Sequence, residues 1–257
     1  MPGAFLVNNQ ISGSATLTPS TEDDAYPVEN LYGLQAANIF RCESKTALTI
    51  LIDFGAAVTA DTIAIINHNF SDVSVLSLKA GSVNPPTTVV ASPTYREHDI
   101  WKSFVSLAAR YWLLTITDSN ANYLEIGQLI IGTRTAMPRA RLMGGYKPAK
   151  KRSNLTEETY AGVPYVYHLF ERHEFNPSFR VASAAELAIL QDLDDQTYGN
   201  FKPFLWIPDQ LGTECYYVRK QRDFEPEEQK GRLPNAELVH DYQMLLVEES
   251  RGLDIQE

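Results

Sequence analysis

The sequence predicts a mainly β protein, with an N-terminal antiparallel β-sandwich followed by a smaller α+β domain that has one main helix. Residues that favour strands are common, since 44% of the chain is apolar and it holds 13 Tyr and 11 Phe. From Phe5 to about Thr133, short apolar or alternating runs recur every 8 to 15 residues or so, separated by Gly, Pro, Asn, Asp and Ser. Only the stretch from Ser183 to Gly199 combines helical periodicity with signals at both ends.

The apolar runs of the N-terminal half predict strands that differ in how many of their two faces are buried. Residues 48–53 alternate between apolar and more polar side chains, so this strand has one covered and one wetter face. The runs 63–66 and 129–131 are apolar at every position and predict central strands. Residues 29–40 predict one short helical turn.

The composition changes between Arg134 and Arg152, where seven basic residues and a Gly-Gly pair occur without any acid. This segment is either a solvated interdomain linker or a basic arm that docks on an acidic neighbour. Both interpretations place the domain boundary here. We therefore expect a β-sandwich at 1–134, a basic linker or arm at 135–155, and an α+β domain at 156–257.

The second half begins with two strand-like stretches, 159–170 and 174–181. A helix is expected at about 184–198, because Ser183 and Glu186 form a capping box ahead of an Ala/Leu stripe and a glycine follows. The later stretch AELVHDYQMLLVEE alternates over its whole length and predicts one long strand.

Charge and cysteine usage exclude several classes of partner. The chain has 22 Lys plus Arg against 32 Asp plus Glu, and its net charge of -10 would repel nucleic acid and anionic membranes. No apolar run is long enough to span a membrane, and from the first residues we expect no export signal. Cys42 and Cys215 fit no metal-binding spacing and are expected to be lone buried thiols.

No catalytic or metal-binding pattern is found, so we expect no cofactor and no enzymatic activity. His168 and His173 would not share a strand face, and the acids at 22–24 and 192–195 lack the spacing of a calcium loop. A glycosidase would need paired carboxylates about 5 to 10 Å apart. Nothing in the sequence supports such a pair.

The tripeptide Asn67-His68-Asn69 follows a buried run and is either an active site or the polar end of a strand. No other residue stands at catalytic or metal-binding spacing from His68. We therefore predict that this imidazole bonds a neighbouring loop and that Asn69 suits the following turn.

Aromatic residues raise the question of a sugar-binding platform, because exposed rings can stack on sugars. Trp112 and Trp206 lie in apolar runs and are expected in the core. Trp101 follows a charged stretch, and with Tyr26 and Tyr95 it forms the candidate ligand platform.

Several short motifs occur in a fixed order: Tyr26-Pro27 with Asn30-Leu31, Ile52-Asp53-Phe54-Gly55, His68-Asn69, Arg110-Tyr111-Trp112, and Gly127 to Gly132. In this order they resemble the discoidin-like (galactose-binding-like) β-sandwich domains found in minor tail proteins of tailed bacteriophages. Leu114 stands where that pattern has a second arginine. The stretch from Ser183 to Gly199 with the following PFLWIPD resembles the C-terminal module of related tail proteins.

The resemblance implies a jelly-roll sandwich and a structural virion protein of the phage tail, assembled in the host cytoplasm. Such a protein would form a homo-oligomeric ring near the distal tail, tail tip or baseplate, and its partners would be copies of itself and other tail proteins. The alternative is a carbohydrate-binding adhesion module that contacts host-surface glycan through the candidate platform.

A ring would suit the basic segment, which could meet an acidic region of the neighbouring subunit. The expected assembly contacts are Arg139, Arg141, Lys150, Lys151 and Arg152. The expected acidic counterpart is the C-terminal group Glu225, Glu227, Glu228, Glu248 and Glu249.

Overall fold

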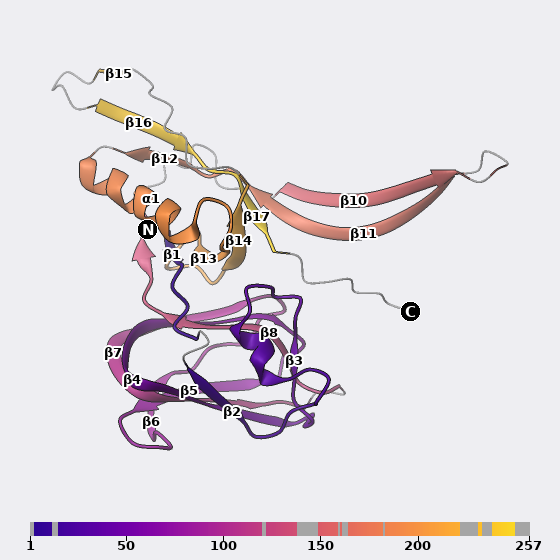
Figure 1. The fold of residues 1–257 in the computed structure, drawn as a ribbon, viewed down its shortest axis with the longest axis vertical. Coiled ribbons are helices and arrows are strands. Elements are labelled where there is room, and N and C mark those ends of the chain that lie inside the picture. The colour runs from indigo at the N-terminus through magenta and orange to yellow at the C-terminus, as the bar shows by residue number, and fades with distance from the viewer. Residues whose placement is uncertain are drawn as a thin grey trace. The chain divides into compact units, whose positions relative to one another are not determined.

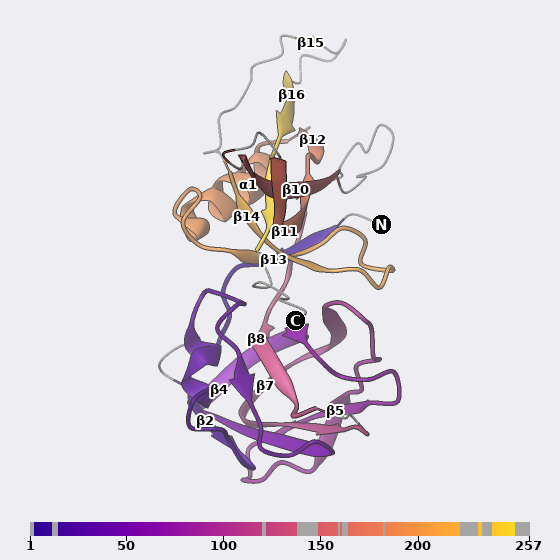
Figure 2. The same cartoon turned by 90° about the vertical axis from the view of Figure 1, so that its right-hand side faces the viewer.

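The computed structural model describes residues 3–11, 15–119, 122–137, 149–158, 160, 164–181, 183–221, 231–232 and 238–249. The chain forms two compact units, one of residues 3–136 with 204–216 and the other of residues 137–203 with 217–257. Figures 1 and 2 show the ribbon in two views. The prediction of a mainly β chain with antiparallel sheets and one main helix is confirmed for the described residues.

The first unit is built around one antiparallel sheet in the order β3-β8-β4-β7-β5-β6, with β2 paired to β4. Its strands are β2 (Thr16–Pro19), β3 (Phe40–Arg41), β4 (Ala47–His68), β5 (Val75–Gly81), β6 (Thr88–Ala91), β7 (Ile100–Thr117) and β8 (Glu125–Gly132). A 3-10 helix, η1 (Val28–Tyr32), provides the expected helical turn.

Strands β4 and β7 are long because each crosses from one layer of a sandwich to the other (Figure 1). The first half of β4 pairs with β2 and with the end of β7, whereas its second half pairs with β8 and with the start of β7. The β4–β7 ladder is irregular between residues 53 and 62, where Gly55 has a φ of 72°. Such irregularities bend strands, so the two halves of the sheet face each other. One core joins side chains of both halves of β4: Leu48, Ile50, Ile52, Ile63 and Ile65.

The prediction of central strands is confirmed for both apolar runs. Residues 62–66 are buried at every position and lie between β7 and β8, and β8 lies between β3 and β4. The outer face of this layer is also buried, at Ala64, Trp101 and Ile130. Strand β1 (Ala4–Leu6) pairs with both β9 (Thr135–Ala136) and β13 (Phe204–Ile207).

The second unit contains a hairpin and a second small sheet. The hairpin strands β10 (Ala149–Glu158) and β11 (Pro164–Phe175) continue through β17 (Leu246–Glu248) to β14 (Tyr216–Lys220). The small sheet has β16 (Leu238–Gln243) between β12 (Ser178–Val181) and β15 (Gly231–Arg232). Within this unit, the outer part of the hairpin projects away from the helix and the other strands (Figure 1).

The helix α1 (Ala184–Thr197) has the predicted ends. The Ser183 hydroxyl accepts a hydrogen bond from the Glu186 amide, and the chain leaves the helix through Tyr198 and Gly199, both with positive φ. The inward face of the helix buries Leu190 and Leu193. Ordinary capping and stop signals therefore located this element from sequence alone.

Three expectations about the C-terminal half need correction. The single long strand is two strands in different sheets, β16 and β17, because the chain turns at residues 244–245, where the Met244 amide donates to the Pro177 carbonyl. Residues 204–216 belong to the first unit because β13 pairs with β1. Part of the expected basic linker, residues 149–155, is strand β10, and residues 138–148 lie outside the described part of the chain.

Candidate ligand site at the strand ends of the first unit

The tripeptide Asn67-His68-Asn69 stands at the end of β4 and ties several loops to that strand. Asn67 adopts a left-handed φ of 53°, its side-chain amide donates to the Ala36 carbonyl at 2.7 Å, and its backbone amide donates to the buried Asp99 carboxylate at 3.1 Å. Asparagine tolerates this conformation better than most residues do.

The imidazole of His68 uses both of its nitrogens. Nε2 lies 2.7 Å from the His98 carbonyl, and Nδ1 lies 3.2 Å from the Phe70 amide. Because an amide can only donate, Nδ1 accepts and Nε2 carries the hydrogen. The ring also stacks on Phe70, with centroids 4.5 Å apart. A neutral ring held in this way positions loops, and it confirms the prediction that His68 bonds a neighbouring loop.

Substitution of His68 by alanine should lower the free energy of unfolding of the first unit by about 1–2 kcal/mol, because two loop hydrogen bonds are lost. Chemical denaturation measures this loss. Val83→Ala, at a side chain that is 70% exposed, is the control and should leave stability unchanged. Loss of a binding activity at wild-type stability would contradict a purely structural role for His68.

Three chain segments meet beside Asn69: residues 23–26, 41–45 and 123–125. Backbone hydrogen bonds of 2.9 to 3.2 Å join the middle segment to both of the others. Asn69 fixes the third segment, since its Nδ2 donates to the Tyr123 carbonyl at 2.7 Å and its Oδ1 accepts from the Glu125 amide at 2.9 Å. The strand-end cluster defined by these contacts consists of Tyr26, Arg41, Lys45, Asn69, Tyr123 and Glu125.

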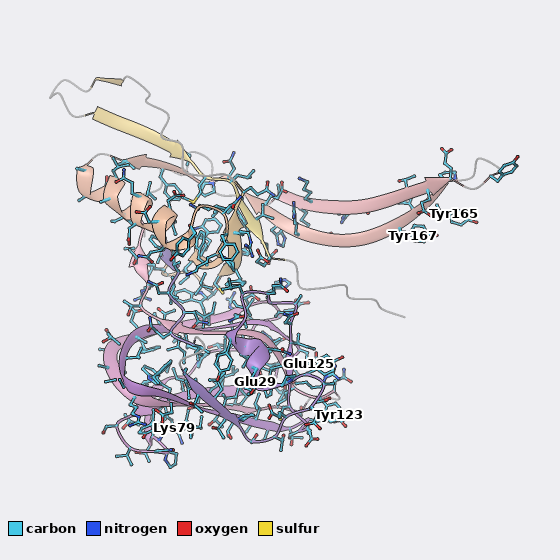
Figure 3. All side chains as sticks on the ribbon, viewed as in Figure 1. Glu29, Lys79, Tyr123, Glu125, Tyr165 and Tyr167 are labelled. Carbon is cyan, nitrogen blue, oxygen red and sulfur yellow. The ribbon has the colours of Figure 1, made fainter. Side chains whose placement is uncertain are left out.

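Each of the two aromatic rings of the strand-end cluster makes a cation–π contact. The Arg41 guanidinium lies 4.0 Å from the centroid of Tyr26, and the Lys45 ammonium lies 5.2 Å from that of Tyr123. Arg41 also donates through Nε to Glu125 Oε1 at 2.7 Å. The Tyr123 side chain is 45% exposed, and Figure 3 shows it at the same end of the first unit as Glu125. Aromatic surface therefore lies beside both hydrogen-bond donors and acceptors.

The charge states of the neighbouring groups are set by their surroundings. Burial alone would lower the pKa of Arg41, but its hydrogen bond with Glu125 and the nearby negative charges raise that pKa above its ordinary value. Burial also raises the pKa of the Tyr95 hydroxyl, and nearby carboxylates such as Asp118 add to the effect. Arg41 thus stays charged and Tyr95 stays a hydrogen-bond donor at neutral pH.

The three aromatic residues predicted as a ligand platform have different surroundings. Tyr26 belongs to the strand-end cluster, and Tyr95 meets His68 edge-on at the end of β4, with centroids 6.1 Å apart. Trp101 is only 9% exposed, because it lies in β7 opposite Ala64 on the covered outer face. The prediction for Trp101 is therefore wrong, and a Trp101→Ala variant would test packing and not ligand stacking.

Sequence reasoning missed most of the strand-end cluster. The missed residues are Arg41, Lys45, Tyr123 and Glu125, with Asn69 considered only as a turn residue. One signal was present in YLEIGQ, where Tyr123 and Glu125 alternate with Leu124 at the start of a strand and so share its outward face.

The motif residues Asp53 and Arg110 form an ion pair between β4 and β7. Arg110 donates to both carboxylate oxygens of Asp53, at 2.7 and 2.9 Å, and its guanidinium lies 4.8 Å from the centroid of Tyr111. The hydrogen bond from Arg110 lowers the pKa of Asp53. This pair stands where the two strands begin to bend, so its position indicates a structural role.

Five basic residues were expected to contact a neighbouring subunit. Arg139 and Arg141 lie outside the described residues. The other three lie in β10 and pair across the hairpin with Glu171 and Glu174 of the same chain, at 2.7 to 3.0 Å.

The expected acidic counterpart is also engaged in part within the chain. Glu248 pairs with His173 at 2.7 Å, and Glu249 pairs with Arg219 at 2.6 Å. Glu225, Glu227 and Glu228 lie outside the described residues. Contact between the basic segment and an acidic tail of another subunit stays a prediction.

The pKa of Glu171 should be measurably low. Hydrogen bonds from Lys150 and then Arg152 lower this pKa from 4.5 to about 2. A lowered folded-state pKa adds stability above the ordinary value, and this contribution is lost as the pH falls from about 4.5 towards 2. Carboxyl NMR titration should give a pKa near 2 in the wild type and one closer to 4.5 in Lys150→Gln with Arg152→Gln.

Lys151→Gln is the matched control for this titration, since Lys151 pairs with Glu174 and not with Glu171. An ordinary Glu171 pKa in the wild type would show that the two ion pairs do not form in solution.

In the residues that the structure describes, no group of three or more His, Cys, Asp or Glu side chains could hold a metal ion. Cys42 and Cys215 are buried free thiols, as predicted. Among the described helices, none is long and apolar enough to cross a membrane. The absence of an enzymatic activity stays a prediction.

No protein-family model and no curated protein sequence matches the chain. Solved structures with similarity include a chitosan-binding module of a Paenibacillus chitosanase/glucanase, at 13% identity and a TM-score of 0.41, which covers 48% of this chain and 98% of that module. A family 32 carbohydrate-binding module of Clostridium perfringens NanJ, in complex with galactose, is 16% identical with a TM-score of 0.40, covering 52% of this chain and 100% of the module.

Another Clostridium perfringens module of the same kind, in complex with GalNAc-β-1,3-galactose, is 9% identical with a TM-score of 0.42, covering 49% of this chain and 99% of the module. Likeness at this level says nothing of what this chain binds. The function proposed below is therefore inferred from the chain's own residues.

Proposed function

We propose that the β-sandwich of the first unit binds a neutral carbohydrate at the strand-end cluster. The observation that carries this proposal is the half-exposed ring of Tyr123, which faces the cation of Lys45 in a segment that Asn69 fixes through the Tyr123 carbonyl and the Glu125 amide. This is the alternative function raised by the sequence, at a set of residues that shares only Tyr26 with the predicted platform.

The chemistry of the strand-end cluster suits a pyranose. An aromatic ring can cover the apolar C–H face of a sugar, and charged planar groups form strong hydrogen bonds to hydroxyls. Arg41 has five N–H donors, of which the Glu125 pair uses Nε while Nη1 lies 3.7 Å from Asp23, and carboxylates accept at two oxygens. A sugar hydroxyl both donates and accepts, so it can join both partners.

The site is also arranged to keep its shape. The side-chain hydrogen bonds of Asn69 and the backbone hydrogen bonds between the three segments are contacts within the chain itself, so little ordering is required on binding. Lys45 covers the ring of Tyr123 through an exposed cation–π contact of about 0.5–1 kcal/mol, which a sugar can displace.

Tyr123→Ala should weaken glycan binding by about tenfold, because the stacking surface is removed. The purified chain is first applied to a glycan array, and the best ligand is then titrated by calorimetry into wild type and variant. Phe201→Ala removes a ring that is 61% exposed in the second unit and is the matched control. Its affinity should equal that of the wild type.

Two results would overturn the proposal. One is an array on which the folded wild-type protein binds no glycan above background. The other is a Tyr123→Ala variant that binds the selected glycan as tightly as the wild type does.

We also propose a second candidate function, a structural subunit of a phage tail that assembles with copies of itself and other tail proteins. The observation that favours it is the projecting β10–β11 hairpin, which exposes Tyr165 and Tyr167 (Figure 3). The protein would then be a virion component assembled in the host cytoplasm. Mass spectrometry of purified particles from a producing culture tests this, and particles without the protein would contradict it.

A further inference from the structure

The hairpin of the second unit has an open edge. Among the described residues, β10 is the terminal strand of its sheet and pairs with β11 alone. Strand β11 meets β17 only at Glu174 and Phe175, so the outer hairpin is a two-stranded ribbon. Such ribbons are marginally stable alone, and an open edge is a template for another strand.

The outer hairpin also exposes apolar side chains on both faces. Tyr165, Val166 and Tyr167 are 51%, 62% and 51% exposed. Neighbouring residues of a strand point to opposite faces, so neither face of the ribbon is covered at these positions. The ribbon therefore has both an edge and two faces on which a partner can pack.

The charges of β10 specify which partner fits its edge. The strand reads AKKRSNLTEE, with Lys150, Lys151 and Arg152 near its start and Glu157 and Glu158 at its end. The hairpin irregularity places an extra residue in β11, so β10 alternates regularly over its whole length. Its charge pattern is therefore basic at one end and acidic at the other.

A second copy of β10 is the complementary strand. Antiparallel pairing about Asn154 places Lys150 opposite Glu158 of the second copy and Lys151 opposite Glu157 of that copy. The twofold axis repeats both pairs, whereas parallel pairing would set like charges side by side. The side chains of Lys150, Lys151 and Arg152 are 60%, 57% and 65% exposed, so they can reach a second carboxylate beyond their pairs within the hairpin.

We infer that two copies of this chain associate through antiparallel β10–β10 pairing into a twofold dimer. This interface is distinct from the strand-end cluster, and the inference does not rest on either proposed function. A twofold dimer uses the same surface on both subunits and closes on itself.

Charge swaps test the inference on the full-length chain. In one variant Glu157→Lys is combined with Glu158→Lys, and in the other Lys150→Glu is combined with Lys151→Glu. Sedimentation equilibrium should show a wild-type dimer and at least tenfold weaker self-association of each variant. An equimolar mixture of the two variants should regain the dimer, because unlike strands then face each other.

The first variant leaves the pairs to Glu171 and Glu174 intact, so its loss of association cannot come from a disrupted hairpin. A wild type that is monomeric at tens of micromolar would overturn the inference. So would a first variant that associates as strongly as the wild type, or a mixture that stays monomeric.

Cysteine cross-linking tests the register. At the twofold axis, Asn154→Cys places two Cα atoms about 5 Å apart, within the range of a disulfide. Thr156→Cys is the matched control, because its two copies would lie about 14 Å apart. Mild oxidation should produce a covalent dimer of the Asn154→Cys variant only. Equal cross-linking of both, or of neither, would overturn the β10 register.

Discussion

Gly127→Ala is expected to destabilise the first unit by about 3 kcal/mol, because overpacking at a fixed backbone position has no space to relax into. A Cβ atom at this position would lie 2.1 Å from the Ala36 carbonyl oxygen and 2.8 Å from the Cβ of Asn67. Neither neighbour can yield, because the Asn67 amide is hydrogen-bonded to that same carbonyl. Chemical denaturation measures the loss.

Gly81→Ala is the matched control for this experiment. A Cβ there would meet Pro86 at an ordinary 3.5 Å, so stability should change by less than about 0.5 kcal/mol. If Gly127→Ala were as stable as Gly81→Ala, the close approach of β8 to residues 36 and 67 would not exist in solution. Glycan binding should weaken together with stability in Gly127→Ala, since β8 carries Glu125.

The sandwich could be predicted because the order of apolar and polar residues along each strand follows which of its faces are buried. Alternation at residues 48–53 marks a strand with one covered face, and continuous apolar runs at 63–66 and 129–131 mark central strands. The ends of α1 were predictable for a similar reason, because capping is a local interaction between Ser183 and Glu186.

The bend of the sheet and the origin of β13 could not be predicted. The irregular pairing of residues 53–62 depends on β7, which lies about 50 residues away in sequence. Strand β13 completes a ribbon with β1 near the other end of the chain. Pairing between distant segments leaves no local signal beyond an apolar run.

The candidate site was mostly missed because it is assembled from distant segments. Tyr26, Arg41 and Tyr123 are ordinary surface residues when taken one at a time. They become neighbours only when β3 pairs with β8 and Asn69 fixes the segment before β8. Trp101 shows the opposite error, because its charged neighbours in the sequence suggested a loop, whereas its strand partners bury it.

Asp194→Ala should destabilise the second unit by about 3 kcal/mol, since it removes the counter-charge of a buried lysine. The Lys220 side chain is 2% exposed and donates to the Asp194 carboxylate, which joins β14 to the last turns of α1. Without this partner the ammonium is left in a site with little water to solvate it. Because Asp194 is itself 27% exposed, the loss should fall at the lower end of the range for buried pairs.

The double variant Asp194→Ala with Lys220→Met separates two contributions to stability. One is the net attraction between the two charges, and the other is the desolvation cost of an unpaired buried ammonium. Methionine fills a similar volume without a charge, so the double variant should recover most of the stability that Asp194→Ala loses. Asp195→Ala, at the exposed neighbouring position, should change stability by less than about 0.5 kcal/mol. A double variant no more stable than Asp194→Ala alone would mean that the lysine is not buried in solution, because removing its charge would then relieve nothing.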